Sequence, residues 1–227
     1  ADSKYIDNET SEGNNYFINI TQNIGDFSKA NIIYENIDRQ LDITVKEDNL
    51  SSMTSRNTKS GFTSTYQNII TDTKTSRNRV SLGFDYNNPD NNRFIKSLKT
   101  NIYSQYSRVD DDSQIKWTNA SSRSSSSYSD VNDYYLKNSI YGGEILTSSD
   151  IELLGKEHKF TYGVDYSKTD TSRLRKKIRD GSTVTNEKDT PDSDITRTGI
   201  YIQDEFSSGN FDFIAGLRYD NYDLDAK

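Results

Sequence analysis

The chain has no cysteine, only two prolines and one histidine, and no long apolar run among its 227 residues. The lack of cysteine excludes a disulfide framework and a thiolate metal site. No segment approaches the roughly 20 apolar residues that a transmembrane helix needs, so a helical membrane protein is excluded. Apolar residues at helical spacing are also lacking, and Pro89 and Pro191 both fall in turn-like stretches, as expected in a sheet protein. These absences predict an all-β chain.

Composition and charge narrow the class further. Hydrophobic residues make up only 31% of the chain, yet it contains 16 tyrosines and 9 phenylalanines. Few aliphatic residues together with many aromatic ones suit a barrel that has a polar interior and an aromatic girdle on its exterior. The net charge of -7 argues against nucleic acid as a partner, because phosphate contacts need a basic surface. Composition alone leaves a soluble, polar β protein open.

The clearest positive signal is two-residue alternation. In His158–Ser167 four apolar residues alternate with polar or small ones, and Phe211–Asp220 repeats the pattern, broken only by Ile214. Successive side chains of a strand point to opposite faces, so each run predicts a strand with one apolar and one polar face. In a barrel, polar-face residues such as Asp165 and Arg218 are expected to line the interior.

The same pattern predicts eight strands, and a ninth that lies somewhere within a longer segment. They are Asn15–Ile24, Lys29–Ile37, Arg77–Tyr86, Ser97–Arg108, Asp133–Thr147, His158–Thr169, Ile195–Phe206 and Phe211–Tyr222, with a further strand within Phe62–Ile70. In Asp133–Thr147 we assign Tyr134, Leu136, Ile140 and Leu146 to the apolar face. The tyrosines expected to form a membrane girdle are Tyr16, Tyr34, Tyr86, Tyr106, Tyr162, Tyr166 and Tyr219. Runs of about ten residues exceed the usual five or six of soluble strands and suit a tilted membrane strand.

Short and long connections alternate along the chain. The short ones are Gly25–Ser28, Asn87–Phe94, Ser148–Glu157 and Ser207–Asn210, and the long polar ones are Asp38–Ser76, Val109–Asp130 and Ser172–Asp194. An outer-membrane barrel has short periplasmic turns and long extracellular loops, whereas a soluble sandwich has no reason to place every long loop at one end. The alternation therefore predicts an antiparallel transmembrane β-barrel.

Three segments carry a resemblance to a known family. They are Thr-Gly-Ile-Tyr-Ile-Gln-Asp-Glu-Phe at Thr198–Phe206, Ala-Gly-Leu-Arg-Tyr-Asp at Ala215–Asp220, and His-Lys-Phe-Thr-Tyr-Gly-Val-Asp-Tyr at His158–Tyr166. Each is similar to strands of TonB-dependent outer-membrane receptors. Their order, and the approach through Asp189–Asp194, most resemble the haem and haemoglobin receptor branch.

The resemblance implies the rest of the functional picture. Such a receptor has a barrel of about 22 strands around a plug domain, so residues 1–227 are expected to be part of the barrel, with about eight or nine strands. The plug and the C-terminal strands are expected to lie outside this chain. The implied function is TonB-dependent uptake of haem or another iron-containing ligand across the Gram-negative outer membrane. The implied partners are outer-membrane lipid, the TonB complex acting through the plug, and haem or a haem protein.

A basic cluster in the third long connection is the candidate ligand-binding site. It comprises Arg173, Arg175, Lys176, Lys177 and Arg179. Arginine and lysine bind carboxylates and phosphates, so the cluster suits haem propionates, lipopolysaccharide phosphates or an acidic protein. The alternative is a solvated loop whose charges are balanced by nearby acidic residues.

Other chemistry has little support in the sequence. The single histidine, His158, is expected at the periplasmic start of its strand, where a structural role fits better than haem ligation. Asp110–Asp112 lacks the spacing of a calcium loop. No nucleophile motif, phosphate-binding loop or metal-ligand set is present, so we predict neither catalytic residues, nor a metal site, nor a resident cofactor, with haem only as transported ligand. Two other classes stay open: a small complete outer-membrane barrel acting as a structural protein or adhesin, and a secreted soluble β-sandwich binding module.

Overall fold

The computed structural model describes residues 8–46, 55–57, 62–89, 95–188 and 191–227, and within them the chain is a single antiparallel sheet. Its strands are β1 (Asn8–Ile24), β2 (Ser28–Lys46), β3 (Ser55–Asn57), β4 (Phe62–Asn87), β5 (Ser97–Ala120), β6 (Ser125–Leu153), β7 (Lys156–Arg179), β8 (Ser182–Glu187), β9 (Ser193–Ser208) and β10 (Phe211–Ala226). The eight long strands follow the order β1-β2-β4-β5-β6-β7-β9-β10, while β3 pairs with β4 and β8 with β7. No helix in these ranges is long and apolar enough to span a membrane.

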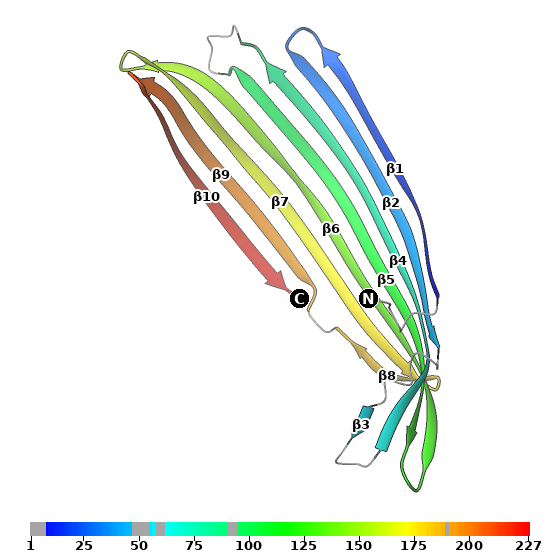
Figure 1. The fold of residues 1–227 in the computed structure, drawn as a ribbon. Coiled ribbons are helices and arrows are strands. Elements are labelled where there is room, and N and C mark those ends of the chain that lie inside the picture. The colour runs from blue at the N-terminus through cyan, green and yellow to red at the C-terminus, as the bar shows by residue number, and fades with distance from the viewer. Residues whose placement is uncertain (1–7, 47–54, 58–61, 90–94, 189–190) are drawn as a thin grey trace.

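The sheet is a curved, unclosed wall (Figure 1). Strands β1 and β10 form its two edges, and within the described ranges they make no contact with each other. The prediction of an all-β, antiparallel, partial barrel of about eight or nine strands is confirmed. A single layer does not fit the two-layer sandwich, and unpaired edges do not fit a small closed barrel.

The β1–β2, β6–β7 and β9–β10 turns lie at one end of the wall, at the top of Figure 1. The β1–β2 and β9–β10 turns contain Gly25 and Gly209, whose φ angles are 67° and 63°. These values lie in the left-handed region, which glycine adopts without the strain that a side chain would cause. The β6–β7 turn contains Leu154 and Gly155 only, so the predicted connection Ser148–Glu157 was too long, since β6 continues to Leu153.

The three long polar stretches are mostly strand, and their prediction as loops was wrong. Strands β4 to β7 have 24 to 29 residues each, which is more than twice what a tilted strand needs to cross a bilayer, roughly 9–11 residues. Val109–Asp130 forms the far ends of β5 and β6 with a tight turn between them. Stretches that are polar on both faces, such as Thr71–Ser76 and Asp110–Ser113, interrupt the alternation within these extensions. Alternation is visible only where one face is apolar.

Register defines the two faces of the wall. Residues paired directly across neighbouring strands share a face, and the series Ile20, Ile32, Leu82 and Ile102 runs without a break across β1, β2, β4 and β5. We call this face the outward face, because the charged residues of the opposite face line a shallow concavity. Many outward apolar side chains remain exposed, Ile102 at 57% and Leu217 at 74%. An exposed apolar face of this extent needs a covering layer.

The predicted apolar face of Asp133–Thr147 was wrong. Ile102 pairs with Gly143, and Val164 pairs with Ile145, so the odd-numbered residues of β6 face outward. The four residues assigned to the apolar face therefore face the concave side: Tyr134, Leu136, Ile140 and Leu146. The run contains apolar residues at both parities, and sequence alone did not separate them.

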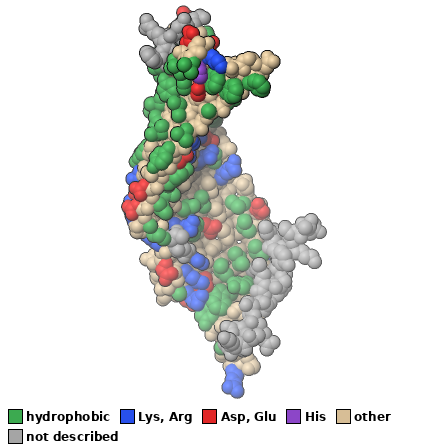
Figure 2. Space-filling view, turned by 90° about the vertical axis from the view of Figure 1, so that its left-hand side faces the viewer, with side chains coloured by type: hydrophobic (Ala, Val, Ile, Leu, Met, Phe, Trp, Pro, Cys, Tyr) green, Lys and Arg blue, Asp and Glu red, His purple; other side chains and the backbone are tan. Residues whose placement is uncertain are grey.

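All seven girdle tyrosines lie on the outward face, as predicted, and Tyr141 joins them. Between Phe211 near the turn and Tyr219, the outward face of β10 is apolar over the roughly 9–11 residues that a tilted strand needs to cross a bilayer. We call the part of the wall from the turns to the outer tyrosines the proximal section, and the part beyond them the distal section. The tyrosines at this boundary are Tyr16, Tyr34, Tyr106, Tyr141, Tyr166 and Tyr219. Figure 2 shows hydrophobic side chains massed along the upper part of the wall, near the single histidine.

Candidate functional site

The two faces exchange character in the distal section. Its outward face is mainly charged and polar, apart from Ile70 and the pairs Val131–Ile178 and Tyr135–Leu174, whereas its concave face carries aliphatic and aromatic residues. The concave residues are Leu41, Ile43, Val45, Ile69, Val109, Ile115, Trp117, Tyr128, Tyr134 and Leu136. All ten are half-buried, whereas many outward apolar residues of the proximal section are exposed. An apolar concave face with a polar exterior indicates that water, not lipid, surrounds the distal section, and that its concave side receives something less polar.

The basic cluster lies on the distal part of β7 and not in a loop, which corrects the prediction. Alternation along the strand then divides it. Arg173, Arg175, Lys177 and Arg179 pair with concave-face residues of β6, namely Leu136, Tyr134, Asn132 and Asp130. Lys176 pairs with Asp133 and faces outward. The structure therefore brings four of the five predicted residues together on the concave face and separates Lys176 from them.

Lys177 and Arg179 are held by a buried carboxylate. Asp130 is only 3% exposed. It accepts hydrogen bonds from Arg179 Nε at 2.7 Å and Trp117 Nε1 at 3.1 Å, and Lys177 Nζ lies 2.9 Å away. Hydrogen bonding to Arg179, with support from Lys177 and Trp117, lowers the pKa of Asp130 to about 2. These two cations thus hold β6 and β7 together.

Aromatic rings complete this node. Trp117 on β5 stacks on Tyr128 on β6 with 4.6 Å between ring centroids. The guanidinium carbon of Arg179 lies 5.1 Å from the tryptophan centroid and 5.4 Å from the tyrosine centroid, within cation–π range. The node joins three strands far beyond the proximal section. Its members are spread over about 60 residues of sequence, and only their register reveals that they meet.

Arg173 and Arg175 form the other part of the cluster. The guanidinium carbon of Arg173 lies 5.8 Å from the ring centroid of Tyr134, while its Nε is buried without a hydrogen-bond partner in the described part of the chain. Arg175 pairs with Tyr134 across the β6–β7 ladder and with Glu187 across the β7–β8 ladder. With Leu136 and Val109 in the next register row, these residues form a patch in which guanidinium groups border apolar and aromatic surface. We call it the Arg–Tyr patch.

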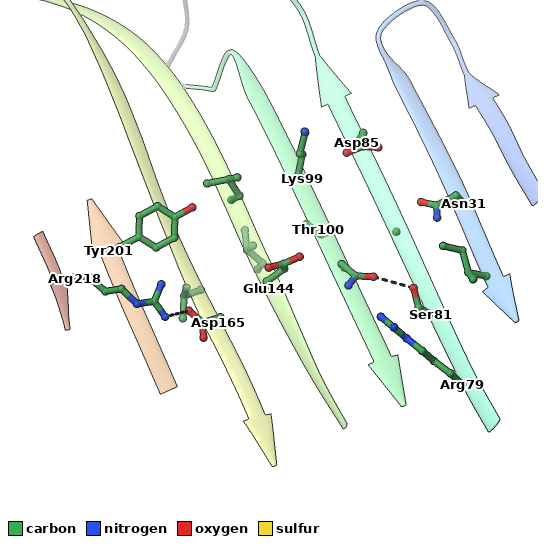
Figure 3. A pocket seen from close by; sticks show the side chains of 16 residues that line it. Asn31, Arg79, Ser81, Asp85, Lys99, Thr100, Glu144, Asp165, Tyr201 and Arg218 are labelled. Atoms are coloured by element: carbon green, nitrogen blue, oxygen red, sulfur yellow. Dashed lines mark hydrogen bonds and ion pairs between the residues drawn. The ribbon is translucent and has the colours of Figure 1, made fainter. Parts of the chain in front are cut away.

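The proximal section has a different concave face. A concavity of about 570 Å³ is lined by charged and amide side chains from six strands, β2 to β9, with Arg218 from β10 (Figure 3). Arg218 Nη2 donates to Asp165 Oδ2 at 2.8 Å, and Arg218 Nε donates to Asp220 Oδ2 at 2.8 Å. Arg197 reaches the same two carboxylates at 3.7 and 3.4 Å. Asp165 and Arg218 thus face the interior, as predicted.

The remaining candidates have structural explanations. His158 lies near the turn end of β7 on the outward face, where its Nδ1 is 2.9 Å from Asp204 Oδ2 and its ring stacks on Phe206 at 4.5 Å. Asp110 and Asp112 face outward, and Asp111 between them faces the concave side. In the described part of the chain, no three acidic, histidine or cysteine side chains gather as metal ligands do.

Together, an outward apolar belt with an aromatic boundary and a charged interior define the wall of an outer-membrane barrel. The sequence profile of one family, described as TonB dependent receptor-like, beta-barrel, matches residues 13–227. The chain belongs to this TonB-dependent receptor β-barrel family. It is therefore a protein of the Gram-negative outer membrane, in a family of TonB-dependent transporters rather than enzymes. No curated protein matches the chain in a sequence comparison.

Proposed function

We propose that the receptor imports haem or another iron-containing ligand, and that the Arg–Tyr patch is part of the surface that captures it. The observation that carries this proposal is the reversed polarity of the distal section. Its concave face is apolar and aromatic although it points into the barrel and cannot contact lipid. Arg173 and Arg175 border that face. Haem combines a flat apolar ring with two carboxylates, so both halves of the patch match it chemically.

The ligand would reach this surface before it passes the proximal section. We propose that a plug domain occupies the lumen beside the charged concavity and that the TonB complex acts on it, with residues 1–227 supplying wall strands and distal hairpins. This arrangement is supported by the polar, concave proximal face and by the plugged lumen of 22-stranded outer-membrane transporters. The bound ligand makes contact with the distal wall first, and movement of the plug then opens the path.

The test uses the complete receptor with Arg173→Gln and Arg175→Gln combined, and Lys176→Gln as the matched control. The control removes one positive charge from the same strand on the opposite face. We expect the double variant to need at least a tenfold higher haem concentration for growth when haem is the sole iron source, and to bind haem correspondingly more weakly. Lys176→Gln should behave as the parent does.

Barrel assembly is checked by heat-modifiable migration in gel electrophoresis, because an unfolded variant would be uninformative. Unchanged haem binding and growth in a correctly assembled double variant would overturn the role of the patch. A parent receptor that binds a ferric siderophore and not haem would overturn haem as the ligand while leaving the site in place.

A further inference from the structure

The concave face of the proximal section divides into two parts by how its charges are satisfied. On β7, β9 and β10, Asp165, Arg197, Arg218 and Asp220 form a closed network of two cations and two anions. Gly199 lies at its centre, where an added Cβ would come within 2.4 Å of both Arg218 and Asp165. This part of the wall is electrically neutral by itself and needs no partner.

On β4, β5 and β6 three charges are left open. Arg79, Lys99 and Glu144 line the concavity, and none of them has an ion-pair partner in the described part of the chain. The carboxylates opposite the two cations are already engaged, since Glu35 pairs with Arg77 at 2.7 Å and Asp85 with Lys29 at 3.5 Å. The guanidinium carbon of Arg79 lies 5.7 Å from the ring centroid of Tyr103. Glu144 pairs in register with Asp165, and like charges directly opposite each other are unfavourable. Figure 3 shows Arg79 and Glu144 reaching toward the middle of the concavity, apart from the network at Arg218.

We propose that the β4–β6 part of this face is the docking surface for the plug domain, and that the β7–β10 part faces the water-filled gap between plug and wall. The partner must present carboxylates to Arg79 and Lys99 and a cation to Glu144. This inference rests on the proposed presence of a plug, but not on the identity of the ligand.

The physical reason is that the free-energy cost of covering the β4–β6 part differs from that of covering the β7–β10 part. Burying an unpaired charge is strongly unfavourable unless the partner supplies the opposite charge, so the open charges select a complementary surface. The network of Asp165, Arg197, Arg218 and Asp220 is already neutral, because its carboxylates are paired with its own arginines. It therefore offers an incoming plug no unpaired charge. Amide and hydroxyl groups of Asn31, Ser81 and Asn101 lie among the open charges, which suits contact with a polypeptide backbone. The concavity is broad and shallow, as a protein surface requires.

The absence of cysteine from this chain makes single-cysteine labelling a direct test. Asn101→Cys on β5 and Gln203→Cys on β9 each place one thiol on the concave face, in a complete receptor otherwise free of cysteine. We expect a water-soluble maleimide to label the β9 position at least tenfold faster than the β5 position. Equal rates, or faster labelling at β5, would overturn the proposal. Urea-unfolded samples, in which both thiols should react alike, provide the reference rates.

Charge reversal gives an independent test in cells. Arg79→Glu combined with Lys99→Glu should loosen the plug and raise sensitivity to a large hydrophilic antibiotic at least fourfold. Lys159→Gln is the matched control, because Lys159 is on the same face but is already paired with Glu205 at 3.4 Å. No increase in sensitivity of a correctly assembled double variant would contradict the docking surface. That result with haem uptake intact would leave the proposed function standing, so the two failures are distinguishable.

Discussion

The proximal and distal sections are built from the same strands in the same register, yet they present opposite polarity. On β4, Leu82 faces outward in the proximal section, in register with Ile32 and Ile102. Thirteen positions away on the same strand, Ile69 faces the concave side in register with Ile115. Strand geometry is continuous between them. What changes is the surrounding medium, so the point at which the apolar face changes sides marks the outer limit of the lipid.

The two sections are also stabilised differently. Lipid covers the outward face of the proximal section, so the apolar side chains at every second position are buried without further protein contacts. The distal section has water on its exterior, and its strands are held by ladder hydrogen bonds, half-buried concave side chains and the node around Asp130. The largest expected effect therefore comes from breaking that node.

Asp130→Ala should destabilise the distal section by about 3–5 kcal/mol, because it removes two charge-assisted hydrogen bonds of about 1.5–3 kcal/mol each, together with the bond from Trp117. It also leaves the half-buried Lys177 and Arg179 without their shared partner. Hydrogen exchange of β5–β7 amides beyond the tyrosine girdle should accelerate, while proximal amides keep their protection. Asp111→Ala is the control on the same face, where among the described residues only Thr73 Oγ1 donates to the carboxylate, at 3.2 Å. The folded-state pKa of about 2 lies below the ordinary value, so this stabilisation is present at neutral pH and is lost as the pH falls toward 2. Equal exchange in the two variants would contradict the role of the node.

Leu82→Arg should cost about 2–4 kcal/mol, since an arginine would replace a lipid-facing side chain within the apolar belt. Ile70→Arg makes the same change on the same face of the same strand, beyond the girdle. Both side chains are similarly exposed in the wall, 45% and 41%, so only the medium differs. Urea unfolding in lipid vesicles should show a large loss for the first variant and little for the second. A similar loss for both would move the lipid boundary outward.

The sequence predicted the proximal section well and the distal section poorly, for one physical reason. Alternation reveals a strand only where its two faces meet different media, as at Phe211–Tyr222 and His158–Thr169. Beyond the girdle, Thr71–Ser76 and Asp110–Asp112 are polar at both parities, so strands there look like loops. The basic cluster was found as a run of charges, but its division between two faces follows from register with β6. Asp130 and Trp117 gave no local signal, because their partnership exists only across three strands.

Gly199→Ala should cost on the order of 1 kcal/mol through the ion-pair network. The new methyl group would occupy the space of the Arg218–Asp165 contact, so those side chains must separate, and a charge-assisted hydrogen bond contributes about 1.5–3 kcal/mol of which water replaces part. Gly216→Ala on the neighbouring strand is the control, because its Cβ would meet nothing closer than 3.6 Å. Urea unfolding of both variants measures the difference. A Gly216→Ala loss equal to that of Gly199→Ala would show that the strand, and not the network, is sensitive to the change.

The smallest expected effect concerns two neighbouring carboxylates on the outward face of the distal section, and here the signs should differ. Partial desolvation and the nearby Asp133 raise the pKa of Asp112, so its ionised form is disfavoured in the folded wall. Because this side chain is exposed and water screens its charge, Asp112→Asn should stabilise the wall by only about 0.2–1 kcal/mol at neutral pH. A hydrogen bond from Arg108 instead lowers the pKa of Asp110, so Asp110→Asn should destabilise the wall above the ordinary carboxyl pKa. As the pH falls, the gain from Asp112→Asn should vanish, because the parent carboxyl then takes up its proton. Unfolding of both variants at neutral and acidic pH decides the matter, and a shared sign at neutral pH would contradict the assigned neighbours.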